Sequence, residues 1–420
     1  MNSILAIFKD KDLRRKILFV LAFLAIFRML AAIPIPSVDP SRLREFLSGN
    51  NFLGLLNIFS GGGLDRISII MLGVGPYITA SIIMQLLTMI FPQLKEMYQE
   101  EGDTGRRKFN QYSRLLTVPL AFLQSYALLS LLIREQIVQP LGAFELFTNV
   151  LMVTAGSLLL MWIGELVSEY GIGNGVSLII FAGIVASIPT DIQQMLFQFD
   201  RTLIPTIVGF LIVAPLVIAG VVVITEAERP IPISYAKRVR GMRMYGGLST
   251  YLPLRVNQAG VIPIIFALSI LLFPSLIGSF LAASSNSTVA SIGGHLVNFL
   301  NNALLYGVSY FLLVFLFTYF YTAVTFDPQA ISTNLQKQGG FVPGIRPGPA
   351  TAEFLSRLTT RITLVGALFL GFIAVLPLIM QAIIQIQTLA FGGTALLIVV
   401  SVVLETIKQI RAQMTLREYD

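Results

Sequence analysis

Ten windows of about 20 mostly apolar residues, each bounded by charged or turn-forming residues, constrain this chain more than any other feature. A hydrocarbon core about 30 Å thick needs about 20 such residues per helix, and only helices or closed barrels satisfy backbone hydrogen bonds there. Charged residues make up 12% of the chain, against about 25% in soluble domains. The sequence therefore predicts an all-α polytopic membrane protein with ten transmembrane helices. They lie at roughly 17–34, 67–92, 113–133, 148–168, 174–189, 203–225, 257–281, 303–325, 362–381 and 393–411.

The basic residues give the orientation of these helices. Of the 29 Lys and Arg residues, 23 lie at the two termini and on the connections after spans two, six and eight, which share one side. Because basic connections stay in the cytoplasm, we expect both termini to be cytoplasmic, as an even number of spans requires. No cleavable signal or Arg- and Ser-rich transit segment precedes the first window, which favours the plasma membrane of a bacterium.

The two longest cytoplasmic connections, about 226–256 and 326–361, mix basic residues with Pro and Gly. Residues 341–348 read FVPGIRPG, with Arg346 placed between two prolines. Pro stiffens a backbone and Gly turns it tightly, so this sequence predicts an exposed projection. A basic projection favours acidic partners such as lipid head groups, ribosomal RNA or an acidic protein patch. The alternative is that the charges only set the orientation.

Residues 59–71, FSGGGLDRISIIM, are unusual for a membrane span. Each of three consecutive glycines weakens a helix by about 1 kcal/mol relative to Ala. Irregular backbone at membrane depth is tolerated only where protein buries it or water reaches it. We therefore expect this segment to enter a cavity and not to meet lipid. The alternative is a loop in which Asp65 is the N-cap of span two.

Functional groups for catalysis are scarce. The chain has no Cys and a single histidine, His295, in an external connection, so we expect no enzyme activity, no metal site and no cofactor. The acidic residues of the apolar windows, Glu165, Glu169 and Glu405, lie toward the ends of spans. Ion-coupled transporters usually carry carboxylates near the midplane, so a secondary transporter of a small solute is only the alternative hypothesis.

Five segments carry a family resemblance. They are Gly75–Gln85 in span two, Ser168–Ser177 before span five, Leu252–Pro263 at span seven, Phe341–Gly348 in the last long cytoplasmic connection and Gly392–Ile398 at span ten. With these matches in order, the chain resembles, from end to end, the SecY family of channel subunits of the Sec protein translocase. The resemblance implies a central protein-conducting channel that passes unfolded secretory proteins across the membrane and releases transmembrane segments sideways.

The resemblance also implies an architecture and site residues. Two inverted, pseudo-symmetric halves of five helices each, residues 1–190 and 191–420, would surround an hourglass pore. The plug, a re-entrant helix at about 57–70, would include Gly61, Gly62, Gly63, Leu64, Asp65 and Arg66. A ring of aliphatic side chains, which gates by dewetting, would comprise Val74, Ile78, Val176, Ile180, Ile265 and Ile398. The lateral gate between spans two and seven would contain Thr79, Gln85, Asn257 and Phe273, with hydrogen bonds across the closed gate.

Partners follow from the same resemblance. Docking would involve Arg240, Arg243, Arg255, Arg346 and Arg357. The implied partners are the small membrane subunits SecE and SecG, the SecA motor ATPase, the ribosome, YidC, membrane lipids, and the signal sequences and nascent chains that pass through. The family often shows paired basic residues where this chain has Met242 and Arg243, so we assign more of the docking to Arg346.

Overall fold

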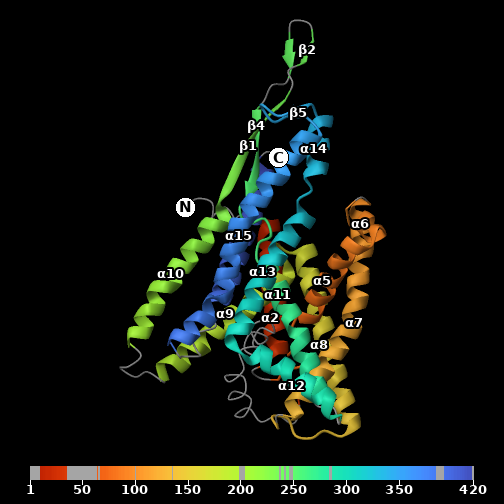
Figure 1. Cartoon of the computed structure of the whole chain (residues 1–420), viewed down its shortest axis with the longest axis vertical. Coiled ribbons are helices and arrows are strands. Elements are labelled where there is room, and N and C mark those ends of the chain that lie inside the picture. Colours follow the sequence, from red (N-terminus) through yellow and green to blue (C-terminus); the bar gives the residue numbers. More distant parts are fainter. Residues whose placement is uncertain are drawn as a thin grey trace.

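The computed structural model is a helical bundle with a β hairpin projecting from one end (Figure 1). It describes residues 10–35, 64, 67–99, 101–134, 136–197, 204–235, 238–240, 243–245, 249–282, 286–384 and 392–418. A helix lies at each of the ten predicted windows. These helices are α2 (Lys11–Ala31), α5 (Gly75–Ile90), α7 (Gly102–Arg134), α8 (Ala143–Tyr170), α9 (Gly175–Phe197), α10 (Ile204–Glu226), α11 (Ile262–Ala282), α13 (Ala303–Thr325), α15 (Pro349–Ile384) and α17 (Gly392–Glu418).

Only some of these helices are uninterrupted apolar spans. Within the described residues, four helical stretches are long and apolar enough to cross a membrane alone: Gly102–Arg134, Ala143–Tyr170, Ala303–Lys337 and Pro349–Met380. A fifth span results if α5 is joined to α6 (Pro92–Gln99), which bends away from it by 116°. The bend follows from Pro92, because the preceding Phe91 has an extended backbone, the conformation that a following proline favours.

Span two begins later than predicted. Residues 67–74 form turns, and α5 starts at Gly75 with Pro76 in its first turn. Gly73 has a φ of 58° and Ile67 a φ of 42°, conformations that an α-helix does not contain. The predicted start at 67 is therefore wrong, and so is the alternative in which Asp65 caps this helix. Residues 67–70, at the end of the predicted plug, are likewise not helical.

The two long connections predicted to be cytoplasmic share a β-sheet that the sequence did not predict. Strand β1 (Glu228–Tyr235) pairs antiparallel with β4 (Ser249–Arg255), and its last two residues pair with β5 (Gly340–Phe341). Ile231 and Ile233 of β1 are buried and alternate with exposed prolines, as expected for a strand with one packed face. The prolines are tolerated because β1 has only one neighbour there. A smaller hairpin of β2 (Arg238–Arg240) and β3 (Arg243–Tyr245) forms the tip.

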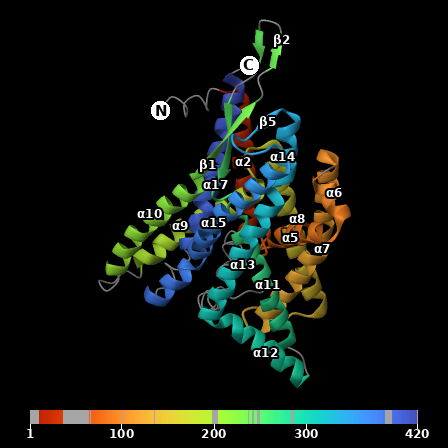
Figure 2. The same ribbon diagram turned by 45° about the horizontal axis from the view of Figure 1, so that its top comes forward.

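Two further helices lie between the spans. Helix α14 (Pro328–Lys337) precedes β5, and Asp327 caps its first turn. Helix α12 (Ser287–Asn301) connects α11 to α13 and lies at the end of the molecule opposite the β2–β3 hairpin in both views (Figures 1 and 2). The apolar core runs between these two ends. Its largest cluster takes side chains from α2, α5, α8, α9, α10, α11, α13, α15 and α17.

Candidate functional site

The six aliphatic residues predicted to line a pore all belong to, or pack against, the largest core cluster. Val74 precedes α5, and the others lie on α5, α9, α11 and α17. Five are buried, and Val176 is partly buried and packs against the cluster. Four helices far apart in the sequence thus contribute apolar side chains to one packed region. These six side chains themselves offer neither a charge to an ion nor a hydrogen bond to water. The six residues are Val74, Ile78, Val176, Ile180, Ile265 and Ile398.

The start of α9 has a fixed geometry, which explains the polar motif at 168–177. Asn174 accepts hydrogen bonds from the backbone N–H groups of Val176 (3.1 Å) and Ser177 (3.2 Å). The N–H of Gly175 donates to the hydroxyl oxygen of Ser168 at 2.8 Å. A Cβ at Gly175 would overlap the carbonyl oxygen of Gly164 on α8. The motif therefore holds α9 tightly against α8 and sets the direction in which Val176 points.

The segment before α5 is buried in protein. Ile67, Ser68, Ile70 and Met71 are all fully buried. The N–H of Ile35 donates to the carbonyl oxygen of Ile67 at 2.9 Å, which ties the segment to the chain after α2. This agrees with the expectation that the segment does not meet lipid.

Of the six residues assigned to the predicted plug, Leu64 is the one that the structure describes. It is fully buried in a second apolar cluster formed largely with α7 and α8. Gly156 on α8 allows the chain to approach closely, since a Cβ there would overlap the carbonyl oxygen of Ile69. The other predicted plug residues, Gly61, Gly62, Gly63, Asp65 and Arg66, lie outside the described residues.

The predicted gate helices α5 and α11 contact each other. Both contribute aliphatic side chains to the largest core cluster, with Ile78 and Ile82 from α5 and Ile264 and Ile265 from α11. Thr79 and Asn257 are buried and Gln85 is half-buried. Phe273 belongs to α11, and the position of its side chain lies outside what the structure describes.

The side-chain oxygens of the predicted gate do not form the hydrogen bonds that we expected between α5 and α11. Within the described part of the chain, Thr79 Oγ1, Gln85 Oε1 and Asn257 Oδ1 are buried without a hydrogen-bond partner. The Nδ2 of Asn257 instead donates to the carbonyl oxygen of Gly260 at 3.2 Å, in the turn before α11. The expectation of cross-gate hydrogen bonds from these oxygens is therefore wrong. The interface has an apolar core with unsatisfied acceptors.

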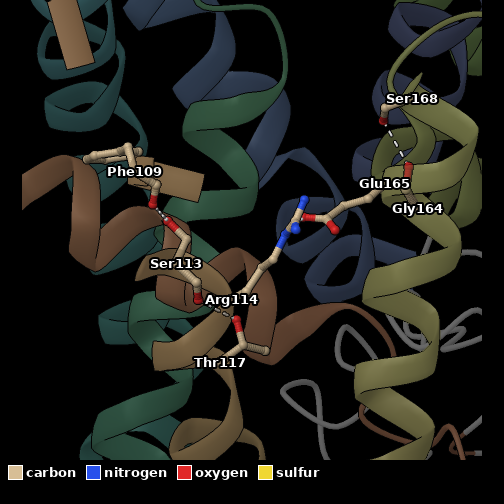
Figure 3. Close-up of polar contacts among 7 residues, drawn as sticks. All are labelled: Phe109, Ser113, Arg114, Thr117, Gly164, Glu165 and Ser168. Carbon is tan, nitrogen blue, oxygen red and sulfur yellow. Dashed lines mark hydrogen bonds and ion pairs between the residues drawn. The ribbon is translucent and has the colours of Figure 1, made fainter. Parts of the chain in front are cut away.

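An ion pair that the sequence reasoning did not predict joins α7 and α8 (Figure 3). Arg114 Nε lies 2.6 Å from Glu165 Oε1, and the Glu165 side chain is 17% exposed. On the same helices, Ser113, Thr117 and Ser168 donate hydrogen bonds to backbone carbonyls one turn earlier. The signal was present, because a carboxylate inside an apolar window needs a cation nearby. A second such pair joins Lys408 of α17 to Glu226 of α10 at 2.8 Å.

Three of the predicted docking arginines have described side chains, and all three are exposed. Arg255 ends β4, and Arg346 lies in the turn after β5, where its carbonyl accepts a hydrogen bond from Thr351. Arg357 on α15 lies 2.9 Å from Glu353, one turn away. Arg240 and Arg243 are backbone register partners in the β2–β3 hairpin, and the positions of their side chains lie outside what the structure describes. Since β5 pairs with β1, the two predicted docking connections form one unit.

Among the described residues, no group of three or more His, Asp or Glu side chains is placed to hold a metal ion. His295 is exposed on α12.

Comparison with known proteins gives the family. A family model described as SecY matches residues 68–407. The protein translocase subunit SecY of Corynebacterium glutamicum is 44% identical, over 100% of this chain and 99% of its own length. The subunit of the same name from Mycobacterium leprae is 42% identical, over the same shares of both chains.

Solved structures agree on the fold. One described as a protein conducting channel has a TM-score of 0.64 at 20% identity and covers 94% of this chain and 91% of its own. Sec61 in the canine ribosome–channel complex from the endoplasmic reticulum has a TM-score of 0.62 with the same identity and coverage. On these matches, full-length in sequence and in fold, the chain belongs to the SecY family of protein translocase subunits.

Proposed function

We propose that this chain is the central protein-conducting channel of a Sec translocase. It passes unfolded secretory proteins across the membrane and releases apolar segments sideways into lipid. One observation carries the proposal: aliphatic side chains from α9, α11, α17 and the start of α5 belong to one apolar cluster in the core. A constriction lined only by such side chains excludes ions by dewetting. Because the contacts are non-directional, the same side chains can part around an extended polypeptide of any sequence.

The lateral gate would lie between α5 and α11, and the plug at about 57–70 would close the pore from outside. Three buried side-chain oxygens without hydrogen-bond partners would favour opening of this gate. They belong to Thr79, Gln85 and Asn257. Leaving a buried polar group unsatisfied costs about 1–3 kcal/mol. Opening would expose these oxygens to water or to the polar backbone of a passing chain, so their hydrogen bonds would be gained in the open state. The closed gate would thus be held by apolar packing and opposed by its own polar groups.

The chain would be a passive subunit that makes and breaks no covalent bond. Two halves, residues 1–190 and 191–420, would part at the gate. The channel would lie in the plasma membrane of a bacterium with both termini cytoplasmic, held by SecE and SecG. The ribosome or the SecA motor would drive transport and dock on the exposed arginines of the cytoplasmic sheet, and YidC would receive released segments.

Photochemical cross-linking of a stalled secretory precursor tests this function. Ile78, Ile180 and Ile398 are each replaced by p-benzoylphenylalanine, and Leu211 and Leu368, which are exposed on α10 and α15, serve as matched aliphatic controls. In vesicles that contain the translocase and its motor, we expect the precursor to cross-link to the first three positions and not to the controls. Equal labelling at all five, or solute uptake without precursor labelling, would contradict a protein-conducting pore.

A further inference from the structure

Helix α12 is a regular α-helix that is too short to cross a membrane. It has 15 residues, a length of about 22 Å, against the about 30 Å of a hydrocarbon core. Asn286 caps its start by accepting from the N–H of Thr288 at 3.1 Å. Asn302 ends it and caps α13 by accepting from the N–H of Leu304 at 3.1 Å.

The connections on both sides keep α12 at the membrane surface. One residue, Asn302, separates it from α13, and four residues separate it from α11. An extended chain spans at most about 3.6 Å per residue, so α12 cannot move away from the ends of the two spans. Its inner face packs on α11, where Leu296 and Val297 lie against Gly278.

The exposed part of α12 is divided into two edges of different chemistry. Ile292 and Phe299 are 57% and 45% exposed, and since they are seven residues apart they share one edge. The neighbouring residues in the sequence, Ser291 and Asn298, are also exposed and form a polar edge about 100° around the helix. An aliphatic and an aromatic side chain therefore face outward beside a strip of polar side chains, and the exposed His295 lies at the border between the two edges.

The surroundings of the apolar edge indicate what covers it. Ile277 near the end of α11, and Leu304 and Val308 at the start of α13, are large apolar residues that are half or more exposed, as lipid-facing residues of membrane helices are. The chain from 283 to 302 contains no Lys, Arg, Asp or Glu, so the Ile292–Phe299 edge can enter the interface without taking a carboxylate, ammonium or guanidinium group out of water. An amphipathic helix with one apolar edge fits the boundary between head groups and acyl chains.

We propose that α12 is an interfacial helix that inserts its Ile292–Phe299 edge into the lipid leaflet at the end of the bundle opposite the β2–β3 hairpin. The Ser291–Asn298 edge stays in water. The occupant of the apolar edge is lipid and not a partner protein. The proposal needs a membrane protein of this fold and does not depend on what the pore conducts.

Spin-label accessibility tests this arrangement, because the chain has no native Cys. Single variants Ser291→Cys, Ile292→Cys, Asn298→Cys and Phe299→Cys of the full chain are labelled with a nitroxide in vesicles of phosphatidylethanolamine and phosphatidylglycerol. Collision with oxygen, which concentrates in lipid, is compared with collision with a water-soluble nickel chelate. We expect an oxygen-to-nickel ratio several-fold higher at 292 than at 291, and at 299 than at 298. Leu304→Cys and Arg346→Cys give the lipid and water references.

Three outcomes would overturn the proposal. Water-like ratios at all four positions would place α12 off the membrane, and lipid-like ratios at all four would mean that it is fully inserted. Low collision rates with both reagents at 292 and 299, with normal reference positions, would mean that protein covers the edge. Each adjacent pair tests the arrangement by itself, so the loss of one variant leaves the other pair to decide.

Discussion

The ion pair between Arg114 and Glu165 at the α7–α8 contact is expected to stabilise the fold. Glu165 is mostly buried, so removing Arg114 leaves a carboxylate without its cation. We expect Arg114→Leu to lower the free energy of unfolding by about 1–3 kcal/mol or more, and Glu165→Gln combined with it to restore part of the loss. Thermal unfolding in detergent of the two single variants and the double variant gives the coupling between the residues.

The exposed pair of Arg357 and Glu353 is the matched control for this prediction. Their side chains are 71% and 68% exposed, and such a pair one turn apart contributes about 0.3–0.5 kcal/mol. Arg357→Leu should therefore change thermal stability much less than Arg114→Leu. Additive effects of the Arg114 and Glu165 substitutions, within about 0.5 kcal/mol, would show that the ion pair does not stabilise the bundle.

Some relations between side chains can be predicted from the sequence and others cannot. That Val176 and Ile180 share one face of a helix was predictable, because they are four residues apart. That Glu165 would pair with Arg114 was not, because the partner lies on another helix. The unsatisfied oxygens of Thr79 and Asn257 depend on rotamers and packing that no local pattern contains.

At the scale of whole helices, the gate assignment makes a prediction about depth. Thr79 lies eleven residues before the end of α5, and Phe273 lies eleven residues after the start of α11. At 1.5 Å per residue, both are about 17 Å from the cytoplasmic ends of two helices that the predicted topology makes antiparallel. We expect Thr79→Cys with Phe273→Cys to form a disulfide that blocks secretion in reconstituted vesicles. Reduction should restore transport.

The control for the disulfide is Thr79→Cys with Ile277→Cys. Ile277 is exposed and lies one turn after Phe273, farther from the predicted cytoplasmic end of α11. This pair should neither cross-link nor block secretion. Normal transport with the Thr79–Phe273 bond fully formed would mean that α5 and α11 do not separate.

Helices that cross the membrane were predictable because their signal, a long apolar window, is local. The elements that the sequence did not predict have apolar patterns that are short or interrupted by Pro and Gly. The prolines of β1 disguised a strand whose partners lie about 20 and about 100 residues away. Helix α12 is interrupted by Gly293 and Gly294 and is too short to register as a span. The turns at 67–74 depend on positive backbone angles stabilised by the chain after α2.

At the scale of the whole molecule, we predict that Arg346 contributes to docking of the motor. Arg346 is exposed, and its backbone is held by Thr351, so Arg346→Glu should leave the fold intact. We expect the substitution to reduce motor-driven export several-fold and membrane-protein insertion much less. Both are measured in vesicles with purified motor or with translating ribosomes.

Lys11→Glu makes the same change of charge on α2, outside the sheet, at an exposed position. It should leave both activities close to those of the parent chain. An equal loss of export and insertion in Arg346→Glu would show that the turn is structural and does not select a partner.

The sheet is attached to the rest of the chain unevenly. Strand β1 continues from α10, β4 leads into α11, and β5 leads into α15, so every strand connects to helices after residue 191. Helix α5, on the other side of the predicted gate, contributes no strand. A motor or ribosome that moves the sheet would therefore pull on α10, α11 and α15 through the chain, and not on α5. Mechanical work done at the cytoplasmic tip would reach the α5–α11 contact as a separating force, without any ligand entering the gate.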